Sequence, residues 1–117
     1  MAYVDGFVIA VPLGRLDDYK ALAEKAAVVW KEHGALEVVE CVGDNLAMGE
    51  VTSFPRAVQR KDDETVIFSW IRYESRAARD AVMKKVMDDP RMKAEMGNMP
   101  FDGKRMIFGG FNTILEA

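Results

Sequence analysis

The segment Thr65–Glu74, TVIFSWIRYE, alternates in a way that predicts a β-strand with two apolar faces. One face would present Ile67 and Ile71, and the other would present Phe68 and Trp70. Its β-branched and aromatic residues are typical of strands. A strand that is apolar on both sides belongs in the middle of a sheet that is covered on both faces. We therefore expect the rest of the chain to pack around this segment.

Three further segments show strand patterns, and they are Tyr3–Val11, Ala35–Val42 and Lys104–Ile114. The first of them is again apolar on both sides. Gly6 within it, and Gly109 and Gly110 within the last, indicate either a bulge or a place where another group packs closely against the backbone.

The spacing of apolar residues predicts two long helices, Leu16–His33 and Ser75–Met87, a helical turn at Ser53–Val58 and a short helix at Asp89–Met96. Ser75 and Asp89 are natural N-caps, and Pro90 suits the first helical position after Asp89. Gly34 is suited to end the first helix in the left-handed conformation.

The long elements follow one another in the order β-α-β-β-α-β. With right-handed crossovers this order gives a ferredoxin-like α+β fold, in which a four-stranded antiparallel sheet carries both long helices on one face. The first and third strands are then central, in agreement with their two apolar sides. We expect one such domain to span residues 1–117.

Two helices cover only one face of that sheet, so the other face would expose a large apolar patch. A second copy that packs sheet against sheet is the simplest cover, and we expect an obligate homodimer of the dimeric α/β-barrel type. A cavity between or beside the sheets is then the expected ligand site.

Composition narrows the class of protein. Half of the residues are hydrophobic, 30% are charged, and the formal net charge is −3, which argues against nucleic-acid and anionic-membrane partners. The single cysteine, Cys41, excludes an internal disulfide framework and fits a reducing compartment. The start of the chain lacks the pattern of a signal peptide, and no apolar run suffices to span a membrane. We expect a cytoplasmic protein.

Four runs carry a family resemblance: WKEHGALEVVECVGD, DETVIFSW, RDAVMKKVMDDPRM and MPFDGKRMIFGGF. Through them the chain resembles the YbaA-like bacterial proteins, a family of unknown function. The resemblance implies membership of the dimeric α/β-barrel group, which also holds cofactor-independent monooxygenases, muconolactone isomerase-like enzymes and haem-degrading proteins. It implies the fold and the dimer, and brings no activity.

His33 is the only histidine, and it falls inside the apolar stripe of the first helix, in the last turn. Because histidine titrates near neutral pH, this side chain is the candidate general base. The alternative is a packed histidine that bonds to the last carbonyls of the helix.

Arg79 falls in a partly apolar arc of its helix, where a charge needs an anionic partner. Glu40, Asp44 and Asp102 are the expected partners. The arginine would either hold a carboxylate ligand or form a structural ion pair. Asp102 and Arg105 lie near one end of the sheet, and they would form either the polar rim of a pocket or a solvated turn.

Trp70 would line an aromatic pocket or belong to the core. Cys41 has no evident activating neighbour, so we expect an inert thiol. One histidine and no cysteine pair leave no zinc-ligand spacing, and no glycine-rich phosphate loop precedes a helix. We therefore expect no metal and no other cofactor.

Two hypotheses of function follow. In the first, the dimer binds a small apolar, carboxylate or phenolic molecule, and any oxygenase-like or isomerase-like chemistry uses His33 as base. Its substrate-binding residues would be Trp70, Arg79, Arg105, Asp102 and Glu40. In the second, the protein is a non-enzymatic homodimeric binding or assembly module whose polar residues are structural. An enzyme should show a cavity that reaches His33, whereas a structural dimer should have that space filled.

Overall fold

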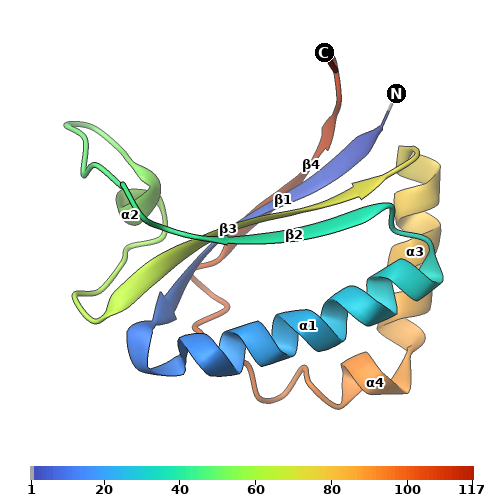
Figure 1. The fold of residues 1–117 in the computed structure, drawn as a ribbon, viewed down its shortest axis with the longest axis horizontal. Helices are drawn as coiled ribbons and strands as arrows, with labels where there is room; N and C mark the ends of the chain where they lie inside the picture. The colour runs from blue at the N-terminus through green and yellow to red at the C-terminus, as the bar shows by residue number, and fades with distance from the viewer. Residues whose placement is uncertain (1) are drawn as a thin grey trace.

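The computed structural model of the protein describes residues 2–117. Its elements are β1 (Tyr3–Pro12), the 3-10 turn η1 (Leu13–Arg15), α1 (Leu16–His33), β2 (Glu37–Val42), α2 (Phe54–Ala57), β3 (Glu64–Tyr73), α3 (Arg76–Asp88), α4 (Pro90–Lys93) and β4 (Ile107–Asn112). The strands form one antiparallel sheet in the order β2-β3-β1-β4. The long helices α1 and α3 lie on one side of this sheet, and α2 lies on the other (Figure 1).

The predicted four-stranded antiparallel sheet is confirmed, with the first and third strands at its centre. The sheet is open, with β2 and β4 as its edges, so no barrel closes within one chain. The last strand is shorter than the predicted Lys104–Ile114. Its first residues form a turn instead, because Asp102 accepts a hydrogen bond from the backbone N–H of Lys104 and pairs with Arg105.

Local signals place the helix ends. The Ser75 hydroxyl accepts a hydrogen bond from the N–H of Ala78 at the start of α3, and Asp89 caps α4 in the same manner. Gly34 ends α1 with a φ of 120°, a conformation that a side chain would strain. The predicted caps are therefore confirmed.

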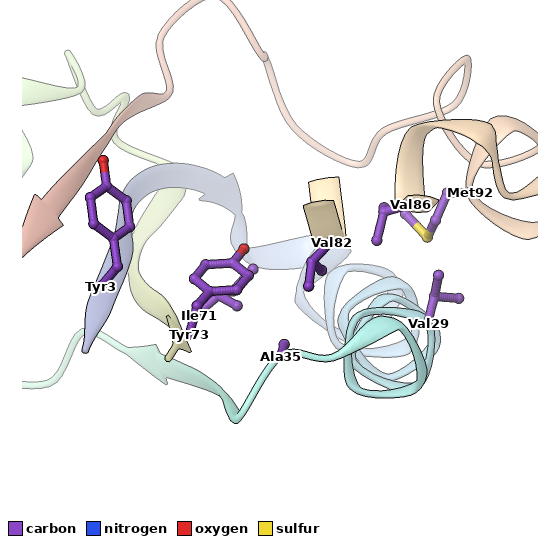
Figure 2. Packing of buried hydrophobic residues seen from close by; sticks show 8 residues of the cluster. All are labelled: Tyr3, Val29, Ala35, Ile71, Tyr73, Val82, Val86 and Met92. Carbon is purple, nitrogen blue, oxygen red and sulfur yellow. The ribbon is translucent and has the colours of Figure 1, made fainter. Parts of the chain in front are cut away.

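The main core decides which side of the strands meets the helices. Figure 2 shows its eight buried residues, Tyr3, Val29, Ala35, Ile71, Tyr73, Val82, Val86 and Met92. Val86 and Tyr73 are fully buried. Burial of a valine contributes about 1.5–3 kcal/mol. The Ile71 and Tyr73 side of β3 therefore faces α1 and α3.

The opposite side of the sheet, which we call the far face, carries Val4, Phe68, Trp70, Ile107 and Phe111. At one end it is covered by α2 and the residue after it, in a cluster of Val8, Ala10, Val58 and Val66. Elsewhere it is open: Phe68 is 44% exposed, Ile107 45% and Phe111 62%. The far face is thus as apolar as the sequence predicts.

The paired glycines of β4 do not form a bulge, since both keep regular register with β1. At Gly110 a Cβ atom would collide with the hydroxyl of Tyr3 and the guanidinium of Arg79. The close packing predicted at this position is therefore confirmed. Gly6 is also in register, and the ring of Phe111 lies over it.

Across residues 2–117, none of the helices combines the length and the apolar character that crossing a bilayer requires.

Candidate functional site

A cleft of about 420 Å³ lies between α1 and the edge strand β2, on the helix side of the sheet. Its volume falls within the range of about 300–1,000 Å³ typical of small-molecule pockets. Its walls are mostly apolar, and they include Leu16 and Ala23 from α1, Val38 and Val42 from β2, and Ile67 from β3.

The cleft follows from the side chains that α1 turns toward the sheet. Ala23 and Ala27 are too small to reach β2, whereas Val29 further along the helix is fully packed in the core. The helix therefore stands off from the strand along its first half. This gap is open to solvent because β2 is an edge strand.

A polar cluster lies at these mostly apolar walls, and the charged side chains of Lys20 and Glu24 on α1 also line the cleft. The phenol of Tyr19 donates a hydrogen bond of 2.5 Å to Oε1 of Glu40 on β2. Ser69 lies opposite Glu40 in the register of β2 with β3, and it is buried. The three residues form a small polar cluster at the base of the cleft.

Burial shapes the ionisation of this cluster. It raises the pKa of the Glu40 carboxyl, while hydrogen bonding from Tyr19 and Ser69 partly offsets the rise. Burial also raises the pKa of Tyr19, and the neighbouring Glu40 carboxylate adds to that rise. Tyr19 is therefore a fixed donor, and the carboxyl of Glu40, which is still partly open to solvent, is an acceptor that is easier to protonate than a glutamate in water.

We expect Tyr19→Phe to raise the pKa of Glu40 further, because the variant loses a hydrogen bond to the charged form while burial remains. A carbon-13 NMR titration of the Glu40 carboxyl would measure the shift. Tyr3→Phe, which removes a phenol that does not line the cleft, is the matched control and should leave the titration unchanged. An unchanged Glu40 titration in Tyr19→Phe would contradict the coupling.

His33 lies outside the cleft. Its Nε2 is 2.9 Å from Oδ2 of Asp89, which also caps α4 and binds Arg91. Hydrogen bonds from Arg91 and His33 hold the pKa of Asp89 well below its usual range. A role of His33 as general base stays a prediction, and the geometry gives it a structural partner at the joint between α1 and α4.

Arg79 packs against β1. Its guanidinium lies 5.0 Å from the centre of the Tyr3 ring and donates a 3.1 Å hydrogen bond to that phenol. Its Nε is 3.3 Å from Oδ1 of Asp5, without the alignment of a hydrogen bond. Its ionic partners are therefore Asp5 on β1 and the exposed neighbour Asp80, at 3.0 Å from Nη1, rather than any of the three acids expected from the sequence.

Arg105 is almost saturated with protein partners. It makes two bonds, of 2.7 and 2.6 Å, to the carboxylate of Glu64, and another of 3.0 Å to Asp102. It also donates to the carbonyl of Gln59 after α2. These bonds tie α2, the start of β3 and the approach to β4 together. A role of Arg105 and Asp102 in substrate binding stays a prediction.

Trp70 lies on the far face, where its indole N–H donates a 2.9 Å hydrogen bond to Glu37. The six candidates from the sequence are thus spread over both faces of the sheet, and only Glu40 lines the cleft. Tyr19 and Ser69 were missed as functional residues. A serine between Ile67 and Ile71 on an otherwise apolar side of the strand is the signal that points to Ser69.

A second, smaller pocket of about 230 Å³ lies on the far face. Cys41, Leu46, Phe54 and Phe68 are among its lining residues. Within residues 2–117, no three His, Cys, Asp or Glu side chains gather as a metal site would require.

Comparison with known proteins places the chain in a family. The family model described as "Protein of unknown function (DUF1428)" matches residues 2–103. The chain belongs to the DUF1428 family. The uncharacterized protein YbaA of Escherichia coli strain K12 is 53% identical to this chain over 116 residues. The match covers 99% of each of the two chains. YbaA of Shigella flexneri matches with the same identity and coverage. The resemblance to YbaA-like proteins is therefore confirmed.

Solved structures confirm the fold of this DUF1428 protein. One described as a dimeric ferredoxin-like protein from an uncultured marine organism matches with a TM-score of 0.62 and 14% identity, over the whole of both chains. The de novo designed protein Foldit4 matches with a TM-score of 0.51 and 12% identity, over 97% of this chain and 99% of that chain. At such identities the shared property is the ferredoxin-like fold.

Proposed function

We propose that the protein is a homodimer of the dimeric α/β-barrel type that binds a small, mostly apolar molecule in the cleft between α1 and β2. The observation that supports this proposal is the hydrogen-bonded pair of Glu40 and Tyr19 within the mostly apolar walls of a cavity of ligand size, with Lys20 and Glu24 of α1 as its other charged residues. Apolar walls provide affinity, and the Glu40 carboxylate provides orientation.

The chemistry of Glu40 narrows the ligand. The carboxylate accepts from Tyr19 and Ser69, but its two oxygens have about four lone-pair sites, so one oxygen can still accept from a ligand. A phenol, enol or alcohol satisfies this oxygen. A ligand carboxylate would be repelled by Glu40 and Glu24, which outnumber the one cation of the same walls, Lys20. Of the ligand classes expected from the sequence, the phenolic class fits this cleft better than the carboxylate class.

The same group supplies the chemistry in any catalytic version of the proposal. A carboxylate with a raised pKa in an apolar cleft can accept the proton of a phenol or of a carbon beside a carbonyl. An isomerase-like reaction follows if Glu40 returns that proton to another carbon, which balances without a cofactor. An oxygenase-like reaction would begin with the same proton transfer.

Three matched probes test the ligand class: 4-ethylphenol, ethylbenzene and 4-ethylbenzoate. We expect the phenol to bind at least about tenfold more tightly than ethylbenzene, because a hydrogen bond to a charged group contributes about 1.5–3 kcal/mol. The benzoate should bind most weakly. Shifts of the unfolding midpoint with ligand concentration give the dissociation constants.

Two variants locate the binding. Glu40→Gln should remove most of the preference for phenol over benzoate, and Ala27→Leu should fill the cleft and abolish binding of all three probes. Ala21→Leu, on the exposed side of α1, is the matched control and should bind as the unchanged protein does. Binding that survives Ala27→Leu would sink the proposal.

The alternative function is a homodimeric assembly module without a ligand. The observation that favours it is that Tyr19 and Glu40 already satisfy each other. If the protein is such an assembly module, none of the three probes shifts the unfolding midpoint, and Tyr19→Phe changes only the free energy of unfolding.

A further inference from the structure

The last five residues of the chain, Thr113–Ala117, form a short tail beyond β4. The N–H of Thr113 still bonds to the carbonyl of Ala2, and the chain then leaves the sheet. Ile114 is 91% exposed and Leu115 is 78% exposed. Two adjacent aliphatic side chains with so little cover in their own protomer point to a partner that buries them.

The far-face pocket offers a site for such side chains. Phe54 and Phe68 form an edge-to-face pair with ring centroids 5.9 Å apart, and Cys41 and Leu46 lie beside them. Its volume of about 230 Å³ is below the range of about 300–1,000 Å³ of small-molecule pockets. The pocket is therefore better suited to aliphatic side chains than to a free ligand.

The tail cannot reach the pocket of its own protomer. Asn112 pairs with Tyr3, whereas Cys41 lies level with Val8 on the opposite edge of the sheet. At about 3.3 Å per residue and about 4.8 Å per strand, these two positions are about 22 Å apart. Leu115 lies three residues beyond Asn112, and a fully extended chain covers at most about 11 Å over that length. Only another copy can bring this tail to this pocket.

The two features lie at opposite ends of the far face. Figure 1 shows α2 and the loop before it at one end of the sheet, and the C-terminus at the other. A two-fold axis that lies between the two far faces and runs diagonally to the strands exchanges the opposite corners of the sheet that carry the tail and the pocket, and it places each tail over the other protomer's pocket. Both contacts form at once, and the assembly is closed.

The size of the interface points the same way. Strands of 6, 10, 10 and 6 residues cover on the order of 500 Å² of sheet, given their spacing. Part of that area is already covered by α2. A standard stable interface buries about 800 Å² of accessible surface per partner, and a tail that packs on the other protomer adds to the area contributed by the sheet.

We propose that, in the homodimer of the proposed function, the tail of each protomer clasps the other, with Ile114 and Leu115 in the far-face pocket. This inference rests on the far-face homodimer. It adds a specific contact that completes the interface, and it gives the exposed apolar loop around Leu46 a role as one wall of the clasp.

A disulfide test uses the cysteine already present in the pocket. Cys41 is exposed in the protomer, so mild oxidation of Leu115→Cys should join the two chains into a covalent dimer on a non-reducing gel. An intrachain link is out of reach, because a disulfide needs Cα atoms about 4.4–6.8 Å apart. The unchanged protein sets the baseline, and Leu115→Cys combined with Cys41→Ser should lose the covalent dimer.

A second measurement does not depend on oxidation. Leu115→Asp should raise the dimer dissociation constant at least about tenfold, whereas Glu116→Gln in the same tail should leave it unchanged. If Leu115→Cys gives no covalent dimer above the baseline while the protein sediments as a dimer, the clasp is overturned and the far-face homodimer stands. If the unchanged protein sediments as a monomer at micromolar concentration, the homodimer itself fails.

Discussion

Phe111→Asp is expected to convert the proposed homodimer to a monomer at micromolar concentration. Phe111 lies on the far face and is 62% exposed in the protomer, so the substitution leaves the fold of one chain intact. In the dimer the new carboxylate would be buried without a partner, at a cost of several kcal/mol. The two-fold axis places two copies in one interface, so the dissociation constant should rise by at least about 10³.

A second phenylalanine of β4 supplies a control. Phe108 is on the same strand and is 71% exposed, but its side chain points to the helix side, where it stacks on Phe7. Phe108→Asp should therefore keep the dimer. Sedimentation equilibrium distinguishes the chain mass of 13.1 kDa from twice that value. A dimer that survives Phe111→Asp and dissociates in Phe108→Asp would place the interface on the other side.

The sequence pattern of the strands already predicts the apolar face that this experiment tests. Alternation in β1 and β3 predicts a sheet with two apolar faces, and the order of elements predicts that both long helices lie on one of them. The sequence does not reveal which side of each strand meets the helices. Both sides of β3 are apolar, so a shift of one residue would give an equally plausible pattern. Packing of Tyr73 and Ile71 against Val82 decides it.

The candidate site was harder to predict, because its residues come together only through the sheet. Glu40 is an expected binding residue, but its neighbour Tyr19 reads as one member of an apolar helical stripe. The Tyr19–Glu40 hydrogen bond depends on the distance between α1 and the edge strand β2. That distance is set by the small side chains of Ala23 and Ala27, and not by polar residues. Asp5 is difficult to predict for a similar reason, because in the sequence it only interrupts the apolar run of the first strand. In the structure its side chain points from β1 toward α3 and pairs with Arg79.

The ion pair of Asp5 and Arg79 has a pH dependence that can be derived from its burial. Burial raises the pKa of Asp5 above its ordinary value of 3.8, while the charge of Arg79 and a hydrogen bond from Tyr73 partly offset the rise. Between 3.8 and the folded pKa, the folded state binds more protons than the unfolded state. The stability contributed by Asp5 therefore falls as pH rises through that window.

Removal of the guanidinium should enlarge this effect. We expect Arg79→Ala to lower the free energy of unfolding by about 2 kcal/mol at neutral pH, between the ~3–5 kcal/mol of a fully buried pair and the ~0–1 kcal/mol of an exposed one. The side chains of Arg79 and Asp5 are 24% and 12% exposed, which justifies an intermediate value. The loss should shrink toward about pH 4, because the unpaired Asp5 is then protonated in the folded state.

Urea denaturation at both pH values measures the loss. Arg76→Ala, an exposed arginine on the same helix, is the matched control and should change stability little at either pH. Asp5→Asn combined with Arg79→Ala should remove most of the pH dependence, because no carboxyl group then remains to titrate at this position. A loss in Arg79→Ala that is equal at both pH values would mean that Arg79 acts through its packing on Tyr3 and not through the charge of Asp5.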